Sequence, residues 1–231
     1  MMVMNRTLKI KQTETQKVFF TSDTHWNHNP KWKVPLWETR GYKSIEESNA
    51  HIIAVTNQIV GENDILFHLG DLTLNCDEAQ FETFIGSLKC KTIYTLWGNH
   101  NNPANKIYRN EVQKTFHPLM ETYIVESNIE VYPFRYKNLV FLGNYVEVIV
   151  DGKYFILAHY PIYVFNYMKE GAMHLCGHSH YNLPLSQADD TSSKILDVGW
   201  DGWARPLSVS EVVYIMNKKG TLKVDHHQTG V

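Results

Sequence analysis

A series of short apolar segments, each followed by a polar side chain that could bind a ligand, constrains the fold of this chain most. Residues 17–22 are rich in β-branched and aromatic residues and run into Asp23. Such a segment predicts a buried strand. Residues 63–69 contain another short apolar run, bounded by turn signals, and lead into Gly70 and Asp71. Ligands of open α/β sheets bind beyond the carboxyl ends of the strands. These polar side chains are therefore expected to gather at one edge of a sheet.

Amphipathic helices are predicted between the first three strands. Ser44 and Glu47 form a capping-box pattern, and the helix that begins there ends near Gly61. A second helix has apolar residues at positions 81, 84, 85 and 88, before a third strand at residues 91–97. This β-α-β-α-β order predicts parallel strands joined by right-handed crossovers.

The rest of the chain is predicted to consist mainly of short strands. Strands are expected at residues 123–131, 139–142, 146–150, 154–158, 172–176, 194–198 and 211–216, a helix within 102–117, an irregular loop at 29–43, and an edge strand or loose arm at 1–16. The pair Asp151-Gly152 is a strong hairpin signal. Because the chain contains no repeat and no low-complexity linker, residues 1–231 are predicted to form one α/β domain of two packed sheets.

Composition and charge limit which partners the protein could bind and where in the cell it is expected. The formal net charge is −2, so the chain lacks the basic signature of a protein that binds long nucleic acid. No apolar run approaches the roughly 20 residues of a membrane span, and the polar start of the chain lacks a signal-peptide core. The three cysteines form no CxxC pair, which is typical of reduced thiols. We expect a soluble, cytoplasmic protein with no membrane partner, and the oligomeric state stays open.

Five predicted strands end on side chains that commonly bind metal ions. They are followed by Asp23 and His25, by Asp71, by Asn99 and His100, by His159, and by His178 and His180. Each group alone is as typical of an ordinary loop or a structural histidine, but five at equivalent positions indicate a metal site. Carboxylate, imidazole and amide ligands without thiolate suit Mn²⁺, Fe or Zn²⁺. Two such ions, about 3.5–4 Å apart, can clamp the oxygens of a phosphoryl displacement. Asp71, the unpaired acid of the set, is predicted to bridge them.

In their order and spacing these groups resemble a calcineurin-like metallophosphoesterase. The pattern of that family runs D-x-H, G-D, G-N-H, a single H, and G-H-x-H, and all five blocks occur here in that order. The resemblance covers residues 17 to about 216. It implies a two-sheet β-sandwich flanked by helices, a four-layer αββα fold, with metal-dependent phosphoric ester hydrolase activity.

The resemblance also implies roles for single residues. One metal ion would be held by Asp23, His25, Asp71 and His180, and the other by Asp71, Asn99, His159 and His178. His100 would not be a ligand; it would donate a proton to the leaving oxygen or stabilise its charge, a role worth roughly 10²–10⁴ in rate. The nucleophile would be a metal-bridging hydroxide. Of the divalent ions, manganese is the first choice, with iron, zinc or nickel as alternatives.

Departures from the family pattern narrow the choice of activity. Residue 101 is Asn where the family often has Asp or Glu, which could leave His100 less basic. The segment after Asp71 lacks the arginine of the protein phosphatases, so a Ser/Thr phosphatase is not expected. Residues 198–208 resemble the V-G-x-D…P-x-S tail of small bacterial and phage members.

The substrate is less constrained. His28, with Trp26 and Trp32, lies just past the first block, where aromatic rings could stack on a base or merely cover the end of the sheet. Arg205 could contact phosphate or make a structural pair. The leading hypothesis is hydrolysis of a small phosphoester, with nucleotides among the candidates. The alternatives are a phosphodiesterase or nuclease of the same fold acting on oligonucleotide ends, and a catalytically inactive scaffold, which would be expected to have lost ligands.

Overall fold

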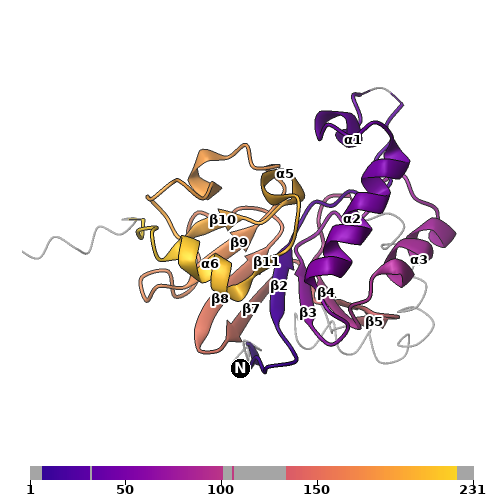
Figure 1. Cartoon of the computed structure of the whole chain (residues 1–231). Helices are drawn as coiled ribbons and strands as arrows, with labels where there is room; N and C mark the ends of the chain where they lie inside the picture. Colours follow the sequence, from indigo (N-terminus) through magenta and orange to yellow (C-terminus); the bar gives the residue numbers. More distant parts are fainter. Residues whose placement is uncertain (1–6, 32, 101–105, 107–133, 223–231) are drawn as a thin grey trace, which may run out of the picture.

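Two β-sheets pack face to face in the computed structural model, which describes residues 7–31, 33–100, 106 and 134–222 (Figure 1). The first sheet has the strand order β11-β2-β3-β4-β6-β5. Its inner strands β2 (Val18–Thr21), β3 (Ile65–His68), β4 (Thr92–Thr95) and β6 (Leu139–Phe141) are parallel, and the outer strands β11 (Leu207–Ser208) and β5 (Phe134–Tyr136) are antiparallel to their neighbours.

The second sheet has the strand order β1-β7-β8-β9-β10. Its strands are β1 (Leu8–Ile10), β7 (Tyr145–Val150), β8 (Lys153–Ala158), β9 (Met173–Cys176) and β10 (Ile195–Asp197). β1 pairs in parallel with β7, so the start of the described chain is an edge strand, one of the two expected arrangements. The hairpin predicted at Asp151-Gly152 is confirmed: β7 and β8 are antiparallel, with Val150 opposite Lys153 and positive φ at both turn residues.

Strand β2 shows why the first sheet is apolar on both faces. Val18 and Phe20 point into the core between the sheets, where the ring centroid of Phe20 lies 5.2 Å from that of Phe155 in β8. Phe19 points to the opposite face and joins the cluster under the helices. A strand buried on both sides has no polar alternation, which matches the continuous apolar run in the sequence.

Two helices cover the outer face of the first sheet (Figure 1). α2 (Ile45–Ile59) begins at Ser44, whose side chain accepts the N–H of Glu47, as the capping-box pattern predicted. α3 (Glu78–Ser87) begins at Asp77 with a complete capping box. Phe81 and Phe84 are buried against the sheet, each contributing roughly 1.5–3 kcal/mol of apolar burial.

The strand predicted at residues 211–216 is wrong. The segment is helix α6 (Val209–Met216), whose first turn is closed by a capping box between Ser208 and Glu211. Val209, Val212 and Met216 recur at helical spacing and pack into the core between the sheets. β-branched residues suggested a strand, but the cap and the helical period determine the structure here.

Short helices also form where none was predicted. They are α1 (Leu36–Thr39), the 3₁₀ helix η1 (Pro184–Ser186) and α5 (Trp200–Trp203). The predicted strand at 123–131 and almost all of the predicted helix at 102–117 lie outside the described residues. Within the described ranges, no helix is long and apolar enough to cross a membrane.

Candidate metal centre

The predicted ligands meet where strand ends from both sheets converge. Asp23 and His25 follow β2, Asp71 follows β3 and Asn99 follows β4, all in the first sheet. The second sheet supplies three histidines after β8 and β9, namely His159, His178 and His180. Main-chain hydrogen bonds join the loops after β2 and β3; in one of them the N–H of His25 donates to the carbonyl of Asp71 at 3.0 Å.

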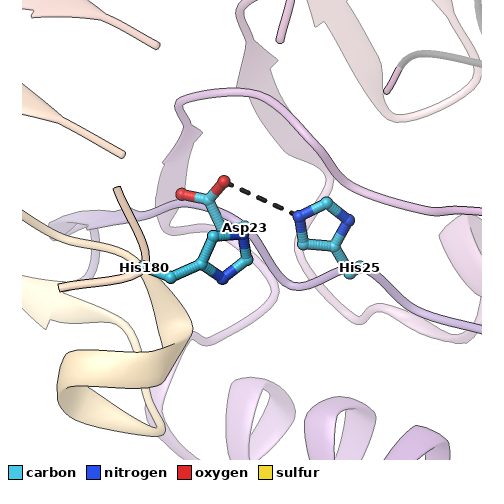
Figure 2. Close-up of side chains that lie close together, drawn as sticks. All are labelled: Asp23, His25 and His180. Carbon is cyan, nitrogen blue, oxygen red and sulfur yellow. Dashed lines mark ion pairs between the residues drawn. The ribbon is translucent and has the colours of Figure 1, made fainter. Parts of the chain in front are cut away.

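Asp23, His25 and His180 form one compact group (Figure 2). Oδ1 of Asp23 lies 3.8 Å from Nε2 of His25. The rings of His25 and His180 are stacked, with centroids 5.1 Å apart and planes inclined by 15°. One ligand atom from each of the three residues lies within 4.8 Å of the others.

The two carboxylate oxygens of Asp71 have different surroundings. Oδ1 accepts the main-chain N–H of His100 at 2.8 Å. Oδ2 lies 3.5 Å from Nε2 of His25 and 3.6 Å from Nε2 of His159. Oδ2 therefore lies between a histidine of the first group and a histidine from the other sheet, the position that a bridging carboxylate needs.

Asn99, His159 and His178 form the second group. Oδ1 of Asn99 lies 2.9 Å from Nε2 of His159 and 2.8 Å from Nδ1 of His178. Nδ1 of His159 is 3.0 Å from the carbonyl oxygen of Leu69, so it is the protonated nitrogen and Nε2 keeps its lone pair. Asp23, Asp71 and His159 also offer atoms within 4.8 Å of one another.

Unusual backbone geometry delivers the ligands. Asp23, His25, Asp71, His178 and His180 all have positive φ, between 46° and 66°. This left-handed region is uncommon for residues other than glycine and costs roughly 1–3 kcal/mol each. Strain of this kind at five predicted ligands indicates a site that the surrounding fold holds in place.

Two glycines of the motifs make room for the carboxylates. A Cβ on Gly98 would lie 2.0 Å from Oδ1 of Asp71. A Cβ on Gly177 would lie 2.1 Å from Oγ of Ser22 and 2.2 Å from Oδ2 of Asp23. These glycines are needed because the chain passes in contact with the carboxylates of Asp71 and Asp23.

The electrostatics of the site fit bound divalent cations. Burial raises the pKa of Asp23 to about 7, and burial lowers the pKa of His25 well below its usual value. Oδ1 of Asp23 and both ring nitrogens of His25 are buried without a hydrogen-bond partner in the described part of the chain. Buried carboxylate and neutral imidazole groups with free lone pairs are what a metal ion requires, and this oxygen and nitrogen donor set suits Mn²⁺, Fe or Zn²⁺.

Three further residues support the predicted ligands: Asp201, which belongs to the V-G-x-D tail, and Arg40 and Asp197, which the sequence did not single out. Nδ1 of His180 lies 2.7 Å from Oδ2 of Asp201, and Asp201 also pairs with Arg40. Asp197 is fully buried and accepts hydrogen bonds from the hydroxyl of Ser179 and the N–H of Tyr181, which hold the loop that carries His178 and His180. The V-G-x-D tail contained a signal for Asp201, but nothing in the sequence paired it with Arg40.

The predicted site residues that are not expected to bind metal differ in burial and in their distance from the candidate ligands. His100 is exposed, with its ring centroid 5.5 Å from that of His25. The ring of His28 is 5.9 Å from that of His25, and burial lowers the pKa of His28 to about 4. Trp26 is buried and stacks on Phe84, as in the alternative that it covers the end of the sheet.

Arg205 makes the structural pair that was its alternative role. Its Nη2 donates to Oε1 of Glu211 at 2.6 Å, and the phosphate contact stays an untested prediction.

The structure adds Tyr160, which the sequence did not single out. Its side chain is half exposed, and its ring centroid lies 4.5 Å from that of His178.

Comparison with known proteins agrees with this geometry. The family model of the calcineurin-like phosphoesterases matches residues 16–196, which include every predicted ligand. The chain belongs to this family. Membership in the calcineurin-like phosphoesterases implies metal-dependent hydrolysis of phosphoesters, and the two-sheet fold with flanking helices agrees with it.

Individual relatives add little about activity. Over 91 residues the chain is 31% identical to Uncharacterized protein MJ1445 of Methanocaldococcus jannaschii, a match that covers 39% of this chain and half of that protein. The crystal structure of the protein of unknown function AQ665 from Aquifex aeolicus is similar over 87% of this chain and 99% of that one, with a TM-score of 0.54 and 18% identity. The second likeness is one of fold alone.

Proposed function

We propose that this calcineurin-like phosphoesterase holds two divalent metal ions and hydrolyses a small phosphoester, such as a nucleotide. The observation that carries the proposal is the placement of Asp71. One of its oxygens is fixed by the N–H of His100, and the other lies within 3.6 Å of both His25 and His159, which belong to the two ligand groups. A shared carboxylate between two sets of ligands is the arrangement that a dinuclear site needs.

The chain supplies seven ligands in two overlapping sets. Asp23, His25 and His180 would hold one ion, Asn99, His159 and His178 the other, and Asp71 both. When bound, the ions would polarise the phosphoryl group and activate the attacking water. Manganese is the first choice, and iron, zinc and nickel are the alternatives.

His100 is proposed to protonate the leaving oxygen or stabilise its developing charge. Its main-chain N–H is bonded to Oδ1 of Asp71, so the residue is anchored beside the shared carboxylate. Its side chain is exposed, which leaves the imidazole accessible to a substrate. A proton donor so placed contributes roughly 10²–10⁴ to a rate.

A nucleotide substrate is favoured by Tyr160. The ring is half exposed and adjoins His178, so one face can stack on a base whose phosphate lies at the metal ligands. Base stacking on an aromatic ring is worth about 1–3 kcal/mol and tolerates any base. The net charge of −2 favours a small substrate over long nucleic acid.

The proposal is tested with metal-free protein reloaded with Mn²⁺, Fe²⁺, Zn²⁺ or Ni²⁺. Turnover of p-nitrophenyl phosphate, of its bis ester and of a nucleotide panel is measured for each metal. We expect metal-dependent turnover that Asp71→Asn abolishes. Asp77→Asn is the matched control, because asparagine caps α3 as well as aspartate does.

The other outcomes separate the alternatives. Preference for the bis ester would support a phosphodiesterase or nuclease. Two bound ions with no turnover of any substrate would overturn the proposal and support an inactive scaffold.

A further inference from the structure

The pair formed by Arg40 and Asp201 lies directly behind one metal ligand. Oδ2 of Asp201 is 2.7 Å from Nδ1 of His180. Because a carboxylate only accepts hydrogen bonds, the ring must donate from Nδ1, and Nε2 then carries the lone pair. In Figure 2 the ring of His180 lies beside the Asp23 carboxylate and faces the ring of His25. Asp201 thus selects the tautomer of His180 that can bind a metal.

Asp201 is itself held by a two-pronged contact with Arg40. Nε of Arg40 donates to Oδ1 at 3.0 Å and Nη2 donates to Oδ2 at 2.8 Å. The side chain of Arg40 is only 7% exposed and that of Asp201 only 18%. Paired contacts of this geometry are stronger and more directional than a single ion pair, and burial protects them from screening by salt.

The same guanidinium also fixes the loop that carries the other two ligands of this ion. Nη2 of Arg40 donates to the main-chain carbonyl of Asp23 at 2.8 Å, and Nη1 donates to that of Thr24 at 2.9 Å. Arg40 therefore joins the loop after β2 to α5, which lies 161 residues away from it in sequence. One side chain orients ligands from both ends of the described chain.

The other ligand group has a neutral support in the described residues. Nδ1 of His159 donates to the main-chain carbonyl of Leu69, whereas Nδ1 of His178 lies against Oδ1 of Asn99, which is itself a proposed ligand of this group. A carboxylate that accepts from a ligand histidine raises its basicity and fixes its orientation, whereas a neutral carbonyl does so less strongly, because its hydrogen bond is not charge-assisted. The two ligand groups are therefore unequal in their supports.

We infer that Arg40 and Asp201 are positioning residues that make the ion held by Asp23, His25 and His180 the tighter of the two. This inference deepens the proposed function and rests on it for the two ions. Loss of such a support lowers metal affinity by about 10- to 100-fold. The effect is expected at one ion and not at the other.

The test is a titration of metal-free protein with Mn²⁺, with free Mn²⁺ followed by electron paramagnetic resonance. Wild-type protein is expected to bind two ions. Asp201→Asn, which removes the charge and keeps the shape, is expected to bind one ion with wild-type affinity and the other about 10- to 100-fold more weakly. Arg40→Lys keeps the positive charge but loses the paired hydrogen bonds of the guanidinium to Asp201. It is expected to show a smaller loss of affinity for the same ion.

Glu211→Gln is the matched control. It weakens a similar arginine–carboxylate pair, with Arg205, while glutamine can still close the capping box of α6. It should bind both ions as the wild type does. Thermal unfolding of each metal-free variant shows whether the fold is kept.

The possible outcomes separate a failure of the inference from a failure of the proposed function. Wild-type affinity for both ions in folded Asp201→Asn overturns the inference and leaves the proposed function standing. An equal loss of affinity for both ions in Asp201→Asn also overturns the inference. If Asp201→Asn does not fold, Arg40→Lys decides by the same criterion. A wild-type protein that binds no Mn²⁺, Zn²⁺ or Ni²⁺ overturns the proposed function itself.

Discussion

His178 donates its main-chain N–H to Oδ2 of Asp23 at 2.9 Å, across 155 residues of sequence. The bond joins the loop after β9 in the second sheet to the loop after β2 in the first. It leaves Oδ1 of Asp23 as the oxygen without a hydrogen-bond partner among the described residues. The contact thus orients the carboxylate, with one oxygen used by the fold and the other available to an ion.

Gly177→Ala should disrupt this contact. The added methyl would lie 2.2 Å from Oδ2 of Asp23 and 2.1 Å from Oγ of Ser22, so the two loops must move apart. We expect impaired metal binding, and a free energy of unfolding lower by about 1–3 kcal/mol. Metal content and thermal unfolding measure both effects. Gly86→Ala in α3 is the control, because its methyl meets nothing within 4 Å and should be neutral or slightly stabilising. Unchanged metal content in Gly177→Ala would contradict the steric argument.

His100→Ala should separate chemistry from metal binding. The ring is not proposed as a ligand, and the main-chain N–H that bonds Asp71 is kept in the variant. We expect two bound ions and a kcat lower by roughly 10²–10⁴. Metal analysis and steady-state kinetics on the same sample test this. His51→Ala, at an exposed position of α2, should change neither quantity. Loss of an ion from His100→Ala would assign the ring to the ligands instead.

Tyr160→Ala should weaken binding of substrates that carry a base. Removing a stacking surface of about 1–3 kcal/mol should raise KM for a nucleotide roughly 5- to 150-fold. KM for ribose 5-phosphate, which has no base, should stay the same. Tyr160→Phe, which keeps the ring, should behave as the wild type does, and Tyr214→Ala removes an exposed tyrosine on α6 as a control. A similar rise for both substrates would count against stacking.

His174 should make the fold sensitive to acid. The ring is fully buried in β9, where Nε2 accepts the N–H of Ile162 at 2.9 Å, and burial lowers the pKa of His174 to about 4 from an ordinary 6.5. Between these values the unfolded chain binds a proton that the folded protein excludes, so the free energy of unfolding falls as the pH falls. The loss approaches roughly 3 kcal/mol near pH 4, and above pH 6.5 the group contributes no slope.

His174→Gln tests this dependence by urea unfolding from about pH 7.5 to about pH 4.5. The variant should be less stable at neutral pH, and the difference from the wild type should shrink with acidification. His51→Gln, at an exposed position, should follow the wild-type pH dependence. A constant difference between wild type and His174→Gln would show that His174 is not the group responsible.

The sequence predicted the features that depend on local pattern. The caps at Ser44 and the turn at Asp151-Gly152 are determined by neighbouring residues, so they could be read directly. The β-branched residues of α6 favour a strand by propensity, but the capping box between Ser208 and Glu211 and the helical spacing of its apolar residues determine a helix. The candidate ligands were also predicted from a local signal, a strand followed by a polar residue, and the structure brings groups of them together.

The supports of the ligands could not be found in this way. Arg40 lies in a segment predicted to be an irregular loop, and its partner Asp201 follows it by 161 residues. Only the packing of the two sheets brings them together, and no spacing in the sequence encodes that distance. Asp197 likewise reads as the end of a strand until its buried hydrogen bonds are seen.

The ligands come from both sheets, and this has a consequence for how the protein opens. At the ligand end, bound ions would cross-link the two sheets. At the opposite end the sheets are joined without metal, because Gln12 donates to the carboxylate of Asp151, in the turn before β8, and accepts the N–H of Val18 in β2. A chelator would therefore loosen the sandwich unevenly. Amide hydrogens near the carboxyl ends of β2 and β9 would exchange faster, while those at the other end of the same strands would keep their protection.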